Sequence, residues 1–112
     1  MSGDRMRRVD EAIREVLSDA LGGSDLKDPR IGFVTVTDVK TSADLRHARV
    51  YVTVLGDDKA RERSLAGLRS AHGLLQRRVN AELRMKRTPT LEFRYDDNTD
   101  RAMRMEQLLD DH

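Results

Sequence analysis

Basic side chains are concentrated in one stretch of the 112-residue chain, between residues 69 and 87. This stretch contains a single acid, Glu82, and six basic residues, which are Arg69, Arg77, Arg78, Arg84, Lys86 and Arg87. A guanidinium group can donate paired hydrogen bonds to phosphate oxygens, and it stays charged at any working pH. A helix that carries such groups can follow a nucleic-acid backbone, because binding releases condensed counterions. These residue types therefore indicate a polyanion-binding surface; the alternative is an ordinary solvated helix surface.

A glycine interrupts the helical pattern within the same stretch. Apolar residues at helical spacing run from Leu65 to Leu83, and Gly73 falls among them. Glycine inside a helix costs about 1 kcal/mol relative to alanine, so we expect two helices with a kink at residues 71–73. The second helix would then expose N–H groups and the positive end of its dipole, which attract phosphate. The candidates at this kink are Arg69, Ser70, Ala71, His72 and Gly73. The alternative is that Gly73 only permits close contact between the two helices.

Residues that could perform catalysis or hold a metal form no recognisable group. The three histidines lack metal-ligand spacing, the chain has no cysteine, and neither the phosphate-loop nor the nucleophile-elbow glycine motif is present. The adjacent carboxylates Asp57-Asp58 and Asp96-Asp97 are typical of helix caps. We therefore expect no enzyme activity, no metal, no cofactor and no small-molecule substrate.

The overall composition hides the uneven distribution of charge. The chain has 21 basic and 20 acidic residues, a net charge of +1, yet residues 57–88 carry +5 and residues 89–112 carry −4. The length fits one domain over 1–112, and 38% hydrophobic residues can supply a core. The first ten residues are charged, and no apolar run approaches the roughly 20 residues that span a bilayer. We expect a cytoplasmic protein that does not bind membranes.

Periodicity predicts the elements that must position the basic side chains. A helix is expected over 4–21, an antiparallel hairpin over 33–39 and 47–55, and a third strand over 91–95, with a short C-terminal helical tail over 97–112. The order is α-β-β-α-α-β, an α+β fold with a three-stranded sheet covered by helices on one face. Because only 4% of the residues are aromatic, base stacking across the sheet is not expected.

Several of these motifs, in this order and at this spacing, resemble the family of bacterial ribosome-binding factor A. The matching stretches include Leu26-Lys27-Asp28-Pro29-Arg30-Ile31-Gly32, Val34-Thr35-Val36-Thr37-Asp38-Val39, Ser42-Ala43-Asp44-Leu45-Arg46-His47-Ala48, Ala71-His72-Gly73 and Pro89-Thr90-Leu91-Glu92-Phe93. The likeness covers residues 5–109, and each piece is weak alone whereas their order together is specific.

The resemblance implies a type II KH-like RNA-binding domain in which an Ala-Xaa-Gly kink replaces the usual G-x-x-G loop. It also implies a non-catalytic factor that binds the 30S small ribosomal subunit and its 16S rRNA. Such factors support late 30S maturation, 16S rRNA processing and cold adaptation. One position departs from the family: the residue three after Gly73 is often Arg and is Gln76 here, so we assign it no phosphate contact, and Arg77 and Arg78 take that role.

The leading hypothesis is a monomeric assembly factor that binds 30S through 16S rRNA, with other assembly factors as further partners. The residues at 69–73 and the bases up to Arg87 would contact phosphates. Weaker candidates on neighbouring surfaces are Arg7, Arg8, Arg30 and Arg46. The alternative is a protein-interaction module whose basic helix docks an acidic protein.

Overall fold

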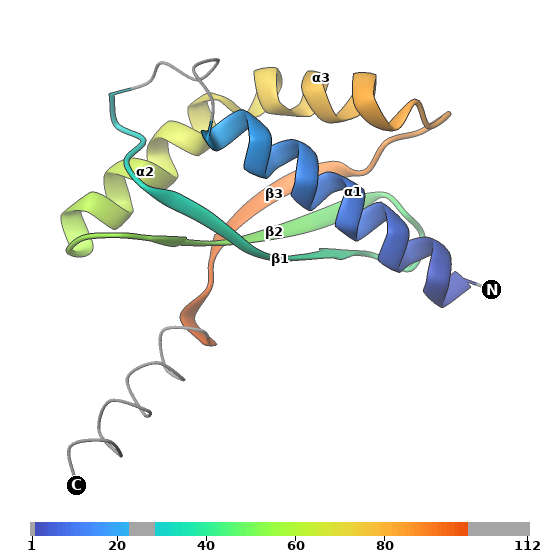
Figure 1. Ribbon diagram of the computed structural model, residues 1–112, viewed down its shortest axis with the longest axis horizontal. Coiled ribbons are helices and arrows are strands. Elements are labelled where there is room, and N and C mark those ends of the chain that lie inside the picture. Colours follow the sequence, from blue (N-terminus) through green and yellow to red (C-terminus); the bar gives the residue numbers. More distant parts are fainter. Residues whose placement is uncertain (1, 23–28, 99–112) are drawn as a thin grey trace, which may run out of the picture.

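Six elements follow one another in the order expected from the sequence. The computed structural model describes residues 2–22 and 29–98. The elements are α1 (Ser2–Gly22), β1 (Val34–Thr41), β2 (His47–Val54), α2 (Asp58–Ser70), α3 (His72–Leu83) and β3 (Thr90–Tyr95) (Figure 1). The predicted α-β-β-α-α-β order is thus confirmed, with element ends shifted by one or two residues. The helical tail expected over 97–112 lies outside the described residues from residue 99 onward.

The three strands form one sheet in the order β1-β2-β3. β1 and β2 pair antiparallel, with Val34 opposite Val54, so the predicted hairpin is confirmed. The register shifts at Thr37, where a β-bulge adds one residue to β1. β3 pairs parallel to β2 on its other side, and α2 with α3 provides the crossover that a parallel pair requires.

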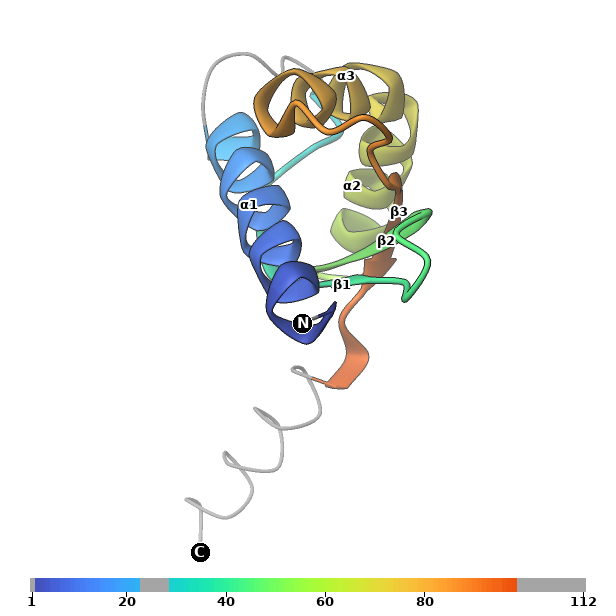
Figure 2. The ribbon, with the colours of Figure 1, turned by 90° about the vertical axis from the view of Figure 1, so that its right-hand side faces the viewer.

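The helices lie on one face of the sheet (Figure 2). α1 packs over β1, and α2 packs over β2 and β3. Side chains of β2 alternate accordingly: Ala48, Val50 and Val52 are buried beneath the helices, whereas Arg49 faces the open side. The expected α+β architecture with helices on one face is confirmed.

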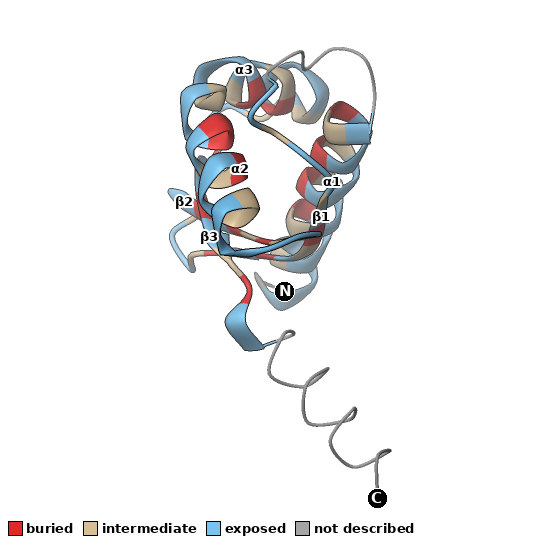
Figure 3. Ribbon diagram, turned by 90° about the vertical axis from the view of Figure 1, so that its left-hand side faces the viewer, coloured by how far each residue is buried: buried red, intermediate tan, exposed pale blue. Residues whose placement is uncertain are grey.

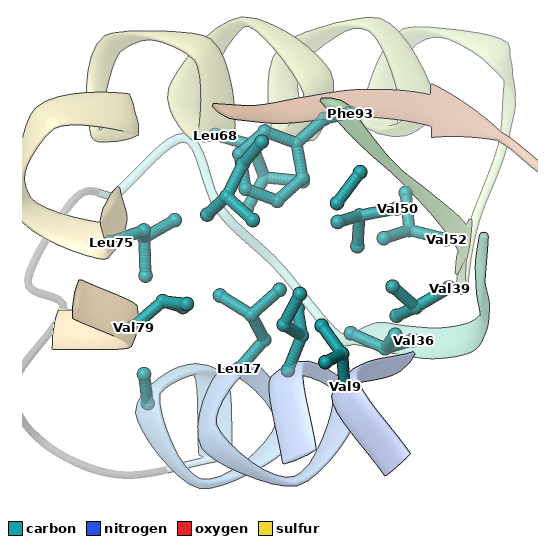
Figure 4. Packing of buried hydrophobic residues seen from close by; sticks show 14 residues of the cluster. Val9, Leu17, Val36, Val39, Val50, Val52, Leu68, Leu75, Val79 and Phe93 are labelled. Carbon is teal, nitrogen blue, oxygen red and sulfur yellow. The ribbon is translucent and has the colours of Figure 1, made fainter. Parts of the chain in front are cut away.

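The core lies between the three helices and the sheet (Figure 4). The apolar stripe of α1 supplies Ile13 and Leu17, both with 0% exposure, and α3 supplies Leu75 and Val79. Buried positions on all three helices face inward, and exposed ones face outward (Figure 3). The amphipathic pattern of the sequence therefore sets the direction in which each helix faces.

The segment that leads into β1 is held against α2 at a glycine. A Cβ on Gly67 would lie 2.6 Å from Cγ1 of Ile31, so only glycine lets this segment approach the helix so closely. One turn earlier, the Ser64 hydroxyl oxygen accepts a hydrogen bond from the N–H of Gly32 at 3.1 Å. It also donates to the carbonyl oxygen of Arg30 at 3.4 Å. These contacts attach the chain between α1 and β1 to the middle of α2.

Candidate nucleic-acid interface

The junction between α2 and α3 is the predicted kink. Ala71 lies between the two helices with φ −85° and ψ 5°, and its N–H donates to the carbonyl oxygen of Gly67. The bend therefore falls at Ala71, and Gly73 is already the second residue of α3. A Cβ on Gly73 would meet only Nη1 of Arg77, at 3.6 Å, which is an ordinary contact. The kink expected at residues 71–73 is confirmed, with the bend at the first of the three.

The N-terminus of α3 lies open at the surface beside this kink. Ala71 makes no side-chain cap for the helix, and both Ser70 and Gly73 are exposed. Within the described residues this helix end thus lacks a side-chain cap, and the positive end of the helix dipole there attracts an anion. The missing Cβ of Gly73 leaves room for a ligand to approach the backbone.

His72 is held against β3. Its Nε2 lies 2.8 Å from the carbonyl oxygen of Leu91, and its ring meets Phe93 edge-on at 6.4 Å between centroids. The imidazole thus already has a partner at Nε2 within the protein. His72 contributes to the site by fixing α3 on the strand, and its exposed side lies at the rim of a groove.

Gln76 joins α3 to the same strand. Its Oε1 accepts a hydrogen bond from the N–H of Leu91 at 2.8 Å, and its Nε2 donates to the carbonyl oxygen of Pro89 at 2.9 Å. In a parallel ladder the polar groups of alternate residues point away from the neighbouring strand, and Leu91 is such a residue. His72 and Gln76 together satisfy both of its backbone groups. Gln76 therefore has a structural role in joining α3 to β3.

A groove of about 690 Å³ runs between α2 and β3. Arg61, Leu65, Arg69 and His72 line its helical side, and residues 91–95 line its strand side. The guanidinium carbon of Arg61 lies 3.8 Å from the centroid of the Tyr95 ring, and its Nη2 lies 3.2 Å from a carboxylate oxygen of Asp97. The Arg61 charge is therefore already engaged, whereas Arg69 forms no ion pair with any residue the structure describes.

The predicted cations differ in their surroundings. Five of them form no ion pair within residues 2–22 and 29–98: Arg69, Arg77, Arg84, Lys86 and Arg87. All five are exposed. Exposed charges without a carboxylate partner are available to an anionic ligand, so these five are the strongest candidates at the interface.

Arg78 points elsewhere. It is half-buried and lines a hollow of about 520 Å³ between α1 and α3, together with Glu15, Asp19 and Glu82. Successive residues on a helix point about 100° apart, so Arg77 and Arg78 cannot share one face. The structure brings Arg77 to the kink and Arg78 to α1.

The weaker candidates are spread over three places. Arg7 lies on α1 and is 3.8 Å from a carboxylate oxygen of Asp4, and Arg8 lines the α1–α3 hollow. Arg30 lies in the segment attached to α2. Arg8 shares that hollow with Arg78, whereas Arg46 lies near the end of the predicted basic stretch: its carbonyl oxygen accepts a hydrogen bond from the N–H of Thr90 at 2.8 Å, next to the loop that carries Arg87.

Sequence reasoning missed the groove residues on α2 and β3. Arg61 and Arg94 stand in segments where basic and acidic residues alternate, so no local excess of charge marks them. Arg94 is also paired, since its Nε donates to Glu92 at 3.0 Å. This ion pair is the main cause that lowers the pKa of Glu92 below its ordinary value.

No cluster of three metal-ligating side chains occurs among the described residues, and none of the described helices is long and apolar enough to cross a membrane.

Comparison with known proteins identifies the relatives of this chain. A family model described as ribosome-binding factor A matches residues 5–109. A ribosome-binding factor A from Geobacter metallireducens is 48% identical over 105 residues, covering 94% of this chain and 88% of the relative. Another from Anaeromyxobacter dehalogenans is 50% identical over 107 residues, covering 95% of this chain and 77% of the relative.

Solved structures share the fold. The crystal structure of ribosome-binding factor A from Thermus thermophilus matches with a TM-score of 0.69 and 28% identity, covering 80% of this chain and 94% of that one. A homology model of the Thermus thermophilus protein, fitted into the cryo-EM map of a 30S–RbfA complex, matches with a TM-score of 0.59 and 29% identity. It covers 80% of this chain and 89% of the fitted one.

Proposed function

Because this chain belongs to the ribosome-binding factor A family, we propose that it binds the 30S ribosomal subunit through 16S rRNA. In this role it supports late 30S maturation and 16S rRNA processing, and it acts by binding rather than by catalysis. The Thermus thermophilus relative has been fitted into a 30S complex, which supports the same target for this chain. The observation that carries the proposal is the set of five exposed cations on the kink, α3 and the loop that follows, none of which forms an ion pair with a described residue.

The kink would receive the RNA backbone. Arg69 and Arg77 flank the uncapped N-terminus of α3, so a phosphate placed there meets two guanidinium groups and the helix dipole together. The absence of a side chain at Gly73 lets the phosphate approach the backbone. Contacts of this kind position a protein on RNA without reading base sequence.

The remaining cations would extend the contact along α3. The helix has twelve residues, which is about 18 Å at 1.5 Å per residue. Arg69 lies before its first residue, and Arg84, Lys86 and Arg87 follow its last. A folded RNA can therefore be contacted at both ends of α3. Recognition by shape and backbone suits this arrangement, since the described aromatic residues do not form a stacking platform on the sheet.

Binding to purified immature 30S subunits across a salt series tests this proposal. Wild-type affinity should fall steeply with salt, and the double variant Arg69→Ala/Arg77→Ala should bind more weakly with a slope shallower by about one for each lost phosphate contact. Arg14→Ala is the matched control, because Arg14 is an exposed arginine on α1 away from the kink.

Two outcomes would contradict the proposal. Equal binding by the double variant and the control would remove the kink from the interface. Competition by an acidic polypeptide but not by 16S rRNA would instead identify a protein-docking module. Circular dichroism of each variant checks that the fold is intact.

A further inference from the structure

A second hollow lies between two loops at the end of the molecule away from the kink. One loop is the β1–β2 turn, residues 42–46, and the other joins α3 to β3, residues 84–89. The hollow measures about 570 Å³ and is lined by Arg46, His47, Arg87, Thr88 and Thr90. Two guanidinium groups, an imidazole and two hydroxyl groups thus surround it, and none of its described lining residues carries a carboxylate.

The turn that carries Arg46 is held by its own hydrogen bonds. Ser42 donates through Oγ to Oδ1 of Asp44 at 2.6 Å, and the same carboxylate oxygen accepts from the N–H of Arg46 at 3.1 Å. The Ser42 hydroxyl oxygen also accepts from the N–H of His47 at 3.1 Å. Leu45 completes the turn in the left-handed region, at φ 59°. The backbone at Arg46 and His47 is therefore held by a network, so this part of the turn needs little ordering when a ligand binds.

The loop that carries Arg87 is attached to the rest of the molecule at its end, at Pro89 and Thr90. Pro89 is buried, and its carbonyl oxygen accepts the hydrogen bond from Gln76. The N–H of Thr90 donates to the carbonyl oxygen of Arg46 at 2.8 Å, which joins this loop directly to the β1–β2 turn. Arg46 and Arg87 thus come from segments far apart in the sequence and converge on one hollow.

The acids nearest the hollow do not neutralise it. Asp44 is 4.0 Å from Nε of Arg46, both side chains are largely exposed at 59% and 64%, and an exposed pair at that distance is weak. Glu92 on the open sheet face is paired with Arg94. Arg87 forms no ion pair with a described residue. The hollow therefore retains positive charge.

We propose that this hollow binds a backbone phosphate of RNA, held by the guanidinium groups of Arg46 and Arg87 and by the hydroxyl groups of Thr88 and Thr90. Guanidinium and hydroxyl donors together match the oxygens of a phosphodiester. Thr90 is the first residue of β3, and the rest of this strand lines the groove beside α2. An RNA segment that lies along the groove can therefore reach the hollow at the start of the same strand. This inference rests on the proposed function, which it extends to a second contact.

Amide NMR spectra of the full chain provide the first test. Addition of a short oligoribonucleotide should shift the signals of His47, Arg87, Thr88 and Thr90, and inorganic phosphate should shift the same signals at much higher concentration. Shifts produced by an acidic peptide and not by RNA would overturn the assignment of the ligand. An absence of shifts at these residues with RNA would overturn the site.

Binding to immature 30S subunits provides the second test. The variant Arg46→Ala/Arg87→Ala should weaken binding and reduce the salt slope by about one or two, while Arg14→Ala leaves both unchanged. If this variant binds like wild type while Arg69→Ala/Arg77→Ala does not, the hollow is excluded and the proposed function stands. If wild type itself fails to bind 30S, both proposals fail. Both arginines are exposed, so thermal unfolding should be near that of wild type.

Discussion

The carboxamide of Gln76 gives Leu91 of β3 the hydrogen bond that a further strand would otherwise provide. It accepts the hydrogen bond of the Leu91 N–H at 2.8 Å on the side of β3 that faces away from β2. His72 satisfies the carbonyl oxygen of the same residue. The docking of α3 on the sheet thus depends on two side chains that meet one strand residue.

Removal of the Gln76 carboxamide should destabilise the protein. Gln76→Ala leaves the N–H of Leu91 and the carbonyl oxygen of Pro89 without their partner, and an unsatisfied part-buried group costs about 1–3 kcal/mol. Gln76→Glu retains the acceptor for Leu91 and loses the donor for Pro89, so its free energy of unfolding should fall between those of wild type and Gln76→Ala. Urea unfolding measures all three. An alanine variant as stable as wild type would show that water replaces the carboxamide without cost.

Two glycines in neighbouring helices should respond differently to alanine. Gly67→Ala places a Cβ 2.6 Å from Cγ1 of Ile31, and overpacking of this kind costs about 1–3 kcal/mol. Gly73→Ala meets only the Arg77 guanidinium at 3.6 Å and improves helix propensity by at most about 1 kcal/mol. Thermal unfolding should therefore show a lower Tm for the first variant and an unchanged or higher Tm for the second. Equal losses in both would contradict the packing described at Gly67.

Asp10 should matter for the attachment of α1 to the sheet. Its Oδ1 accepts hydrogen bonds from both the N–H and the hydroxyl group of Thr41, a buried residue at the end of β1. Asp10→Ala leaves both donors unsatisfied, and we expect a loss of about 1–3 kcal/mol in the free energy of unfolding. Asp10→Asn keeps a carbonyl acceptor and should lose less. Glu11→Ala, an exposed acid next to it on α1, is the control and should change little.

The Asp44 carboxyl should titrate below its ordinary pKa of 3.8. The hydrogen bond from the Ser42 hydroxyl is the main cause that lowers this pKa, and the backbone hydrogen bond from Arg46 adds to it. A lowered pKa means that the folded protein favours the charged form. The stabilising contribution is therefore present above pH 3.8 and is lost as the pH falls through the lowered pKa.

Ser42→Ala tests this cause. Carboxyl NMR titration should show the Asp44 pKa moving up toward its ordinary value in the variant. The pKa of Glu92, which Arg94 lowers, should stay where it is in wild type and serves as the internal control. An unchanged Asp44 pKa in the variant would mean that the Ser42 hydrogen bond is not its main cause.

Local patterns in the sequence were sufficient to predict the elements. The stripe through Ile13 and Leu17 predicts α1 and its buried face, and the alternation through Val50 and Val52 predicts β2. Both patterns arise because each side chain's burial follows the geometry of its own element. The kink was found for a similar reason, because a glycine interrupts the helical pattern at residues 71–73, and the structure has the bend at Ala71.

Contacts between distant residues could not be predicted in this way. The meeting of Arg46 with the Arg87 loop depends on the parallel placement of β3 beside β2, and no local periodicity encodes strand order. The same holds for the separation of Arg77 from Arg78, since a count of charges in a window ignores the direction of each side chain. The bulge at Thr37 is also invisible, because strand-forming residues surround it on both sides.

The hydrogen bonds from His72 and Gln76 to the Leu91 backbone also affect how copies of the chain meet at high concentration. Strands at the border of a sheet invite pairing with the same strand of another molecule, and this is a common start of aggregation. At Leu91 both polar groups are already occupied by His72 and Gln76, so a second copy finds neither a donor nor an acceptor there. The two hydrogen bonds that attach α3 to β3 therefore also disfavour pairing of β3 with the same strand of another copy in a crowded solution.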